Sequence, residues 1–222
     1  SFILWGPPGC GKTSLVRIVA EHSGQHFISL SAVTAGTKEI REAVEEARQV
    51  WAGSRKRTWL FMDEIHRLNK AQQDVLLPHV EQGAVLLLGA TTENPSFEII
   101  RPLLSRAQVL VLEPLREPEL ETLIERALAD PVRGLGGTPA RLVPDAVSYL
   151  IAASGGDARI ALNALEVAVL TTPPGADGRR EIVAREVFTR FKSFASFDAG
   201  LPMEALLEQV QRAATVYRRF VT

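Results

Sequence analysis

The 222-residue sequence predicts an α/β fold, in which a doubly wound parallel sheet is followed by a smaller all-helical unit. Two observations lead to this prediction. In the first half of the chain, short runs of apolar residues alternate with helix-like segments, and some runs are apolar on both faces, as parallel strands covered by helices are. From about residue 118 onward, no further strand-like run follows and only amphipathic helical segments remain.

The expected strands of the first part are short and are separated by helices. They are expected at residues 2–5, 26–33, 57–64, 84–92 and 107–115. The helices between them are expected at residues 11–24 with Gly24 as the stop, at 38–53 after a Thr37 cap, and at 69–82, where Pro78 should bend the helix. Together these elements make residues 1–115 the predicted α/β domain.

The second part is expected to be small and helical. Helix candidates cover residues 118–130, 144–156 and 157–172, so residues 116–172 form the predicted helical unit. Residues 173–181 contain two prolines and two glycines, which is typical of a flexible link. Two more helix candidates, near residues 182–192 and 202–220, belong to a linker and tail (173–222) whose placement the sequence leaves open.

Composition limits the classes of protein to which the chain can belong. The 25 lysines and arginines nearly balance 26 acidic residues, so no overall basic field indicates nucleic-acid binding. The single cysteine excludes an intramolecular disulfide and a multi-cysteine metal site. Because the apolar runs are strand-sized and no signal-peptide pattern is present, we expect an intracellular protein without a membrane span: cytoplasm or nucleoid if bacterial, nucleus if eukaryotic.

Residues 6–13, GPPGCGKT, match the phosphate-loop pattern G-x-x-x-x-G-K-[ST] between a strand and a helix. In this pattern glycines let backbone N–H groups turn toward phosphate oxygens, and the start of the helix favours negative charge. Lys12 is expected to contact the β and γ phosphates, and Thr13 to bind Mg²⁺. ATP and Mg²⁺ are therefore the expected cofactors. The loop residues expected to contact them are Gly6, Pro7, Pro8, Gly9, Cys10, Gly11, Lys12, Thr13 and Ser14.

Acidic and polar side chains follow two further strands, at the sheet edge where ligands bind in open α/β sheets. Asp63 is expected to hold Mg²⁺, directly or through water, and Glu64 to orient and deprotonate the attacking water. Residues 91–94, Thr-Thr-Glu-Asn, offer hydroxyl and amide groups to the γ-phosphate or the water, and their spacing does not choose among them. His66, just beyond the acidic pair, is expected to be structural.

Two arginines become candidates because the phosphate loop is present. Arg106 lies between a short helix and the fifth strand, where an exposed guanidinium could reach the γ-phosphate of a neighbouring subunit. Arg159 lies in the first turn of a helix with Asp157 near the cap, from which it could fold back over the nucleotide. Without the loop, both would be interpreted as ordinary surface arginines.

Four segments together resemble a known family: GPPGCGKT, LFMDEIHRLNKAQQDVLLPHVEQG, LLGATTENPSFEIIRPLLSRAQV and GDARIALNALE. They are similar to the AAA+ ATPases of the clamp-loader group and, more narrowly, to the replication-associated recombination protein A family, whose eukaryotic members are the Werner helicase-interacting ATPases. GATTENPSFE with HRLNKAQQD is far more specific than a phosphate loop. The similarity covers roughly residues 1–172, with a fainter match at REIVAREVF and no clear match after about residue 191.

The resemblance implies a five-stranded P-loop ATPase domain, a helical lid, and ATP hydrolysis between adjacent subunits of a ring-like oligomer. It implies the same roles as above for the loop, which binds phosphate and Mg²⁺, and for Asp63 and Glu64, which act as metal ligand and catalytic base. Thr91 best matches the position called sensor 1, Arg106 the trans-acting arginine finger, and Arg159 the sensor 2 of the lid. The implied catalytic residues are then Glu64, Thr91, Arg106 and Arg159.

The resemblance also implies partners. Members of the family are DNA-stimulated ATPases that act at stalled or damaged replication forks and associate with single-stranded-DNA-binding protein or other fork proteins. The implied DNA is a fork, a gap or a single-strand/duplex junction, and the implied assembly is a homo-oligomer. Family members have a segment before the first strand and a helical assembly domain after the lid, which this sequence lacks. We therefore expect a truncated chain, in which phosphate recognition is a safer prediction than turnover.

Three functions are compatible with the sequence. An ATP-hydrolysing motor on fork DNA is favoured by Glu64, Arg106 and Arg159, because a subunit that only binds has no need of them. A nucleotide-gated partner-binding module with little turnover is favoured by the missing flanking segments. A clamp-loader subunit or Holliday-junction motor is disfavoured by ATTENPSFE. DNA contact is weakly encoded, because the basic runs at 55–57 and 218–219 are of a kind that is usually solvated surface.

Overall fold

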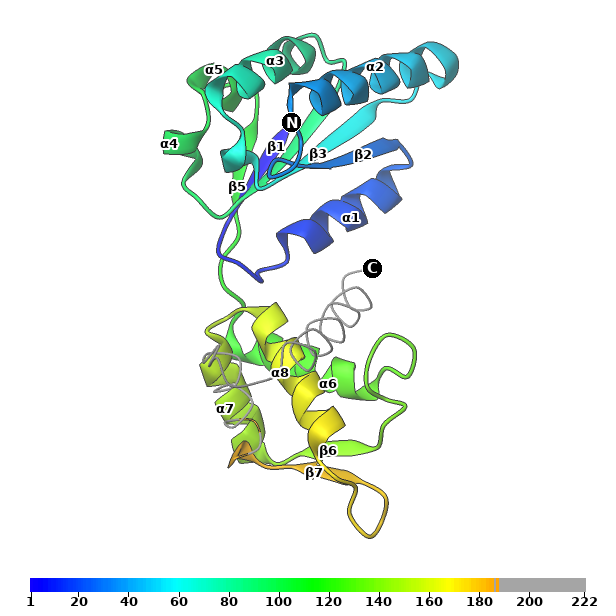
Figure 1. The fold of residues 1–222 in the computed structure, drawn as a ribbon, viewed down its shortest axis with the longest axis vertical. Helices are drawn as coiled ribbons and strands as arrows, with labels where there is room; N and C mark the ends of the chain where they lie inside the picture. The colour runs from blue at the N-terminus through cyan, green and yellow to red at the C-terminus, as the bar shows by residue number, and fades with distance from the viewer. Residues whose placement is uncertain (186, 188–222) are drawn as a thin grey trace, which may run out of the picture. The chain divides into compact units, whose positions relative to one another are not determined.

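The structure is a computed structural model that describes residues 1–185 and 187, and it divides into two units, one ending at Glu113 and the other beginning at Pro114. Each unit has its own sheet and its own hydrophobic core (Figure 1). The first unit is an α/β domain with a five-stranded sheet. The second combines helices with a two-stranded sheet.

The five strands of the first unit are all parallel. They are β1 (Phe2–Trp5), β2 (His26–Ser31), β3 (Thr58–Asp63), β4 (Leu86–Thr91) and β5 (Gln108–Val111), in the spatial order β2-β3-β4-β1-β5. The register pairs Trp5 with Thr91 and Met62 with Gly89. The carboxyl ends of β1, β3 and β4 therefore lie side by side at one edge of the sheet, which is where ligands bind in such folds.

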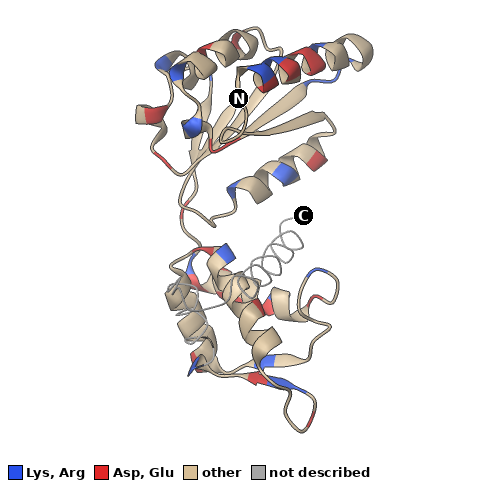
Figure 2. Cartoon of the chain, viewed as in Figure 1, with Lys and Arg blue, Asp and Glu red and all other residues tan. Residues whose placement is uncertain are grey.

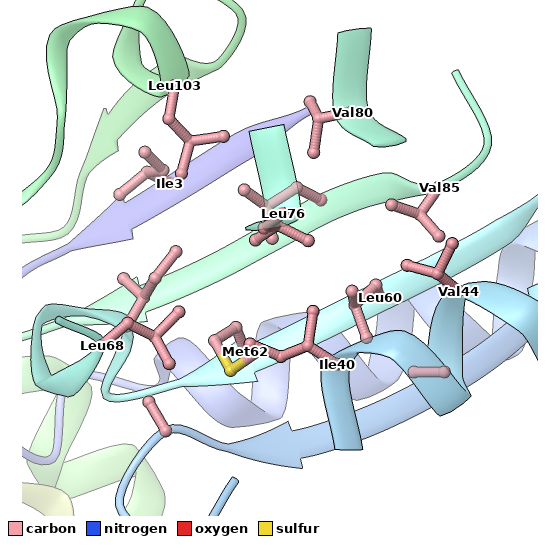
Figure 3. Packing of buried hydrophobic residues seen from close by; sticks show 14 of the residues in the cluster. Ile3, Ile40, Val44, Leu60, Met62, Leu68, Leu76, Val80, Val85 and Leu103 are labelled. Atoms are coloured by element: carbon pink, nitrogen blue, oxygen red, sulfur yellow. The ribbon is translucent and has the colours of Figure 1, made fainter. Parts of the chain in front are cut away.

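Helices cover both faces of this sheet, as the sequence predicts for a doubly wound fold (Figure 1). On one face lies α1 (Lys12–Ser23), and on the other lie α2 (Thr37–Ser54), α3 (Lys70–Glu81) and α5 (Arg101–Leu104). Neighbouring residues of a strand point to opposite faces, so Ile3 joins the α2–α3 side and Leu4 the α1 side. Figure 3 shows the larger core, which includes Ile3, Ile40, Val44, Leu60, Met62, Leu68, Leu76, Val80, Val85 and Leu103.

The helix ends follow local sequence signals, with one correction. Gly24, with φ of 61°, ends α1 as expected. The expected Thr37 cap of α2 is wrong: the cap is Gly36, which has no side chain that could accept a hydrogen bond, and its N–H donates to the Glu39 carboxylate at 2.7 Å. The helix α3 starts after Asn69 and runs on through Pro78 to Glu81.

The second unit is not all-helical, contrary to the sequence prediction. Its helices are α6 (Glu117–Ala129), α7 (Pro144–Ser154) and α8 (Ala158–Thr171), and its strands are β6 (Ala140–Leu142) and β7 (Arg180–Ile182), which pair in parallel. The expected flexible link at 173–181 therefore contains most of β7, preceded by a turn in which Gly178 N–H donates to the Gly175 carbonyl at 2.9 Å. Strands of three residues are too short to show alternation, which is why the sequence missed them.

The predicted linker and tail lie mostly outside the described residues. Of the helix candidate at 182–192, only residues 182–185 and 187 are described, and the candidate at 202–220 and the basic run at 218–219 lie outside them entirely. Within the described ranges, no helix is both long enough and apolar enough to cross a bilayer. The position of the second unit relative to the phosphate loop, and so its role as a lid, stays a prediction.

Candidate nucleotide-binding site

The loop at residues 6–11 connects β1 to α1 and starts in a confined place. The Gly6 N–H donates to the Thr91 carbonyl at 3.2 Å, which ties the loop to the end of β4. A Cβ built at Gly6 would lie 2.3 Å from the Leu112 carbonyl oxygen, so only glycine fits there. Gly11, with φ of 92°, turns the chain into α1 in a conformation that other residues rarely adopt.

The loop presents a row of backbone donors. In the part of the chain that the structure describes, the N–H groups from Gly9 to Thr13 have no hydrogen-bond acceptor, and the first turn of α1 has neither a side-chain cap nor an acidic residue. Such donors at a helix start form an anion site, because they point at the ligand and the helix dipole adds positive potential. This arrangement fits the phosphate groups of a nucleotide.

Lys12 places a positive charge within the same loop. Its Nζ donates to the Gly6 carbonyl at 2.8 Å and to the Pro7 carbonyl at 2.7 Å, and the residue is only 9% exposed. No carboxylate within the described residues forms an ion pair with it. A buried charge held by carbonyls alone favours an anionic ligand. Cys10 is buried beside it, with Sγ 3.9 Å from Nζ, as a small loop residue.

The acidic pair lies at the end of β3, where the chain turns sharply. Asp63 is the last residue of the strand, and its Oδ1 accepts the Glu64 N–H at 3.1 Å. Glu64 has φ of 53° and ψ of 45°, a left-handed conformation that costs a non-glycine residue about 1–2 kcal/mol. Backbone strain of this kind gathers at functional sites. The strained turn leads directly into the 3₁₀ helix η1 (Ile65–Arg67).

Thr91 is the residue of the 91–94 turn that contacts both the start of the phosphate loop and His66. It is fully buried, and its Oγ1 lies 3.0 Å from the Glu93 nitrogen and 3.2 Å from the Glu93 carbonyl oxygen. Asn94 is used elsewhere, since its side chain caps α4 (Pro95–Glu98) by accepting the Ser96 N–H at 3.0 Å. Thr91 thus touches the phosphate loop through its carbonyl and the turn through its hydroxyl.

His66, which the sequence assigns a merely structural place, connects Thr91 to the acidic pair. Its Nδ1 lies 3.0 Å from Thr91 Oγ1 and 3.3 Å from Glu64 Oε2, and its side chain is 9% exposed. The sequence showed the histidine two residues after Glu64. It could not show that η1 turns this residue back to the neighbouring strand.

The two candidate arginines make contacts within their own units. Arg106 Nε forms an ion pair with Glu81 at 2.7 Å, and Arg106 also donates to Ser105 Oγ at 2.6 Å and to a backbone carbonyl of α5. Arg159 lies 3.6 Å from Asp157, whose carboxylate caps α8. Within the described residues, none of these contacts is with the phosphate loop, so the roles of both arginines toward the nucleotide stay predictions.

The oxygen donors expected to hold Mg²⁺ are of a suitable kind. Thr13 begins α1 and Asp63 ends β3, and they offer a hydroxyl and a carboxylate. Mg²⁺ is commonly held by one or two such protein oxygens together with substrate phosphates and waters. No group of three or more His, Cys, Asp and Glu side chains able to hold a metal occurs among the described residues.

Comparison with known proteins leads to the same family as the four sequence segments. Residues 2–115 match the family described as "ATPase family associated with various cellular activities (AAA)". The replication-associated recombination protein A of Escherichia coli is 51% identical over 168 residues, which is 75% of this chain and 37% of that protein. The protein of the same name from Haemophilus influenzae is 48% identical over 180 residues, 81% of this chain and 40% of that protein.

A eukaryotic relative and a solved structure extend the similarity. The ATPase WRNIP1 of Dictyostelium discoideum is 50% identical over 175 residues, 76% of this chain and 19% of that protein. A RuvB mutant of Thermotoga maritima has a TM-score of 0.67 and 27% identity, covering 90% of this chain and 65% of that one. The chain spans two fifths or less of the length of the three sequence relatives. These relatives confirm the resemblance drawn from the four sequence segments. Because the family model matches residues 2–115, which include the whole five-stranded sheet, the chain belongs to the AAA family of ATPases.

Proposed function

We propose that this chain binds ATP with Mg²⁺, hydrolyses it, and uses the hydrolysis to act on DNA in replication-associated recombination and repair. The observation that carries the first part is the phosphate loop, in which consecutive backbone N–H groups have no acceptor among the described residues and the buried Lys12 ammonium is held by the Gly6 and Pro7 carbonyls. The second part is supported by the relatives that are 51% and 48% identical, because they are named for replication-associated recombination.

Each residue of the site has a part in this reaction. The loop N–H groups bind phosphate oxygens, and Lys12 exchanges its two carbonyl partners for oxygens of the β and γ phosphates. Thr13 and Asp63 would hold Mg²⁺, which would supply positive charge to offset that of the phosphates. Glu64 takes a proton from the attacking water as the new P–O bond forms and the bond to the β–γ bridging oxygen breaks. Thr91 orients the γ-phosphate or the water.

The finer parts of the proposal concern partners. A DNA fork, gap or single-strand/duplex junction is the proposed substrate, with single-stranded-DNA-binding protein or another fork protein as an associated partner. The proposed working assembly is a homo-oligomer in which Arg106 of one subunit reaches the nucleotide of the next and Arg159 contacts the nucleotide within its own subunit. The relatives' names support the DNA-related function, and membership of the AAA family supports assembly.

Steady-state ATPase assays test the proposal directly. Rates are measured without DNA and with single strands, duplex ends and forks, for the wild-type chain, Lys12→Ala and Glu64→Gln. We expect Lys12→Ala to lose ATP binding, and Glu64→Gln to keep binding but turn over about 10²–10⁴-fold more slowly, the usual contribution of a general base. If the wild type is no faster than Glu64→Gln under every condition yet binds ATP, the chain is a nucleotide-gated binding module instead.

A further inference from the structure

His66 is the side chain, among the described residues, that touches both Glu64 and Thr91. Its Nδ1 lies 3.3 Å from Glu64 Oε2 at the end of β3 and 3.0 Å from Thr91 Oγ1 at the end of β4. The ring is nearly buried, with 9% of the side chain exposed. One nitrogen atom therefore links the proposed catalytic base to the residue proposed to sense the γ-phosphate.

The backbone holds the ring in this place. The Arg67 N–H donates to the Glu64 carbonyl at 2.8 Å and closes η1 around His66. Ile65, the preceding residue, is fully buried and packs so closely on β4 that a Cβ added at Gly89 would lie 3.0 Å from its Cδ1. The left-handed Glu64 and the anchored Ile65 together fix where the His66 ring lies, so the contact follows from the turn itself.

Counting hydrogens favours one tautomer of His66. A carboxylate oxygen can only accept, so a hydrogen bond between Nδ1 and Glu64 Oε2, which lie 3.3 Å apart, needs its hydrogen on the imidazole. The single hydroxyl hydrogen of Thr91 can go to the Glu93 carbonyl at 3.2 Å, while its oxygen accepts the Glu93 N–H at 3.0 Å. Thr91 Oγ1 is left with one acceptor position, which faces Nδ1. These contacts favour the Nδ1–H form, in which one hydrogen faces two acceptors.

We propose that His66 is a positioning residue that couples Thr91 to Glu64 through this shared Nδ1–H hydrogen. The inference rests on the proposed ATP hydrolysis, because it takes Glu64 as the base. When the Thr91 hydroxyl turns to donate to a γ-phosphate, its oxygen becomes a stronger acceptor, since linked hydrogen bonds polarise one another. The His66 hydrogen then moves toward Thr91 and releases Glu64 to the attacking water.

Nuclear magnetic resonance of the imidazole nitrogens tests the inference without any turnover. The chain has four histidines, so His66→Asn assigns the His66 signals by their disappearance. At a pH where the ring is neutral, we expect the hydrogen on Nδ1. A non-hydrolysable ATP analogue with Mg²⁺ should shift the Nδ1 signal in the wild type but not in Thr91→Val, while His79, on α3, serves as the unaffected control.

Kinetics supply the second readout. His66→Asn keeps an N–H donor near the position of Nδ1, whereas His66→Leu removes it. We expect His66→Leu to lower kcat about tenfold or more, as loss of positioning can, with the Kd for ATP changed less than about threefold. His66→Asn should keep most of the turnover. In a Thr91→Val background, His66→Leu should add little further loss, because the partner through which it acts is gone.

The outcomes separate this inference from the function on which it rests. If the hydrogen lies on Nε2, or if the analogue shifts the His66 signal equally in the wild type and Thr91→Val, the coupling is wrong even when ATP is hydrolysed. Equal losses in His66→Leu and His66→Asn, with lowered melting temperatures, would make His66 a packing residue. If the wild type binds no ATP in calorimetry, the proposed function itself fails.

Discussion

Gly6 illustrates how a single backbone position controls the phosphate loop. Its N–H bonds to the end of β4, and its Cα faces the Leu112 carbonyl, which would lie 2.3 Å from an added Cβ. The start of the loop can therefore lie this close to the Leu112 backbone only because residue 6 has no side chain.

Substitution of Gly6 by alanine should displace the loop or the strand connection beside it. We expect Gly6→Ala to abolish ATP binding and to lower the free energy of unfolding by about 1–3 kcal/mol, the usual cost of overpacking. Urea unfolding and calorimetric titration with ATP measure the two effects.

Gly53→Ala is the matched control: a Cβ at Gly53, inside α2, meets nothing within 4 Å, so alanine there should stabilise by about 0.5–1 kcal/mol. Normal ATP binding by Gly6→Ala would contradict the account of the loop.

Glu64 and His66 show a different residue-scale effect, in which strain and hydrogen bonding occur together. Glu64 adopts a left-handed conformation, and His66, two residues later, returns to contact it. The acidic pair was visible in the sequence as a pattern at a strand end. The contact between His66 and Thr91 was not, because it joins a residue of η1 to the end of β4, 25 positions later.

At the scale of elements, the connection between α2 and β3 gathers positive charge around an aromatic ring. A hollow of about 360 Å³ is lined by Arg48, Trp51, Lys56, Arg57, Gln82, Gly83 and Ala84. The Arg55 guanidinium lies 5.6 Å from the centre of the Trp51 ring. Figure 2 shows that α2 itself carries both signs of charge, so the basic character is concentrated in its connection to β3.

If this connection contacts DNA, reversing its charge should weaken binding in a salt-dependent way. We expect the Lys56→Glu, Arg57→Glu double variant to bind forked DNA more weakly, and the slope of log K against log salt to fall by about 0.9 for each DNA phosphate that the variant no longer neutralises. Fluorescence anisotropy at several salt concentrations measures both the affinity and the slope.

Lys38→Glu, which reverses a charge at the other end of α2, is the control and should leave the slope unchanged. An unchanged slope in the double variant would make the connection ordinary solvated surface.

On the scale of the whole molecule, Arg106 distinguishes an assembly of subunits from a single active chain. Arg106 pairs with Glu81 in its own subunit at 2.7 Å, with 44% of its side chain exposed, and exposed pairs contribute at most about 1 kcal/mol. Breaking the ion pair with Glu81, so that Arg106 can contact a phosphate bound to a neighbouring subunit, therefore costs little free energy. We expect Arg106→Ala to bind ATP as the wild type does and to lose turnover by about 10³-fold or more.

Mixing two inactive variants tests whether Arg106 acts on a neighbour. Lys12→Ala keeps Arg106 but cannot bind ATP, and Arg106→Ala binds ATP but lacks the guanidinium. If the residue acts between subunits, the mixture should regain part of the wild-type ATPase rate, in proportion to mixed interfaces. Glu81→Ala, which breaks the same ion pair, should remain active. A mixture that stays inactive at concentrations where the chains associate would contradict action between subunits.

The sequence by itself determined the architecture of the first unit. Apolar strands, glycine stops and the loop pattern are local signals, and they predicted the parallel sheet, its helices and the row of candidate residues along one edge. The error at the start of α2 is also local: Gly36 and not Thr37 is the cap, and Glu39, three residues later, accepts the Gly36 N–H.

Only the tertiary structure decided which of those residues meet. The order β2-β3-β4-β1-β5 puts β4 between β1 and β3, so Thr91 lies between the phosphate loop and the acidic pair, and His66 reaches it. The same holds for β6 and β7, which pair although they are far apart in sequence. Hydrogen bonds between distant strands depend on register and on the turns that bring strands together, and neither leaves a periodic pattern in the residues that form them.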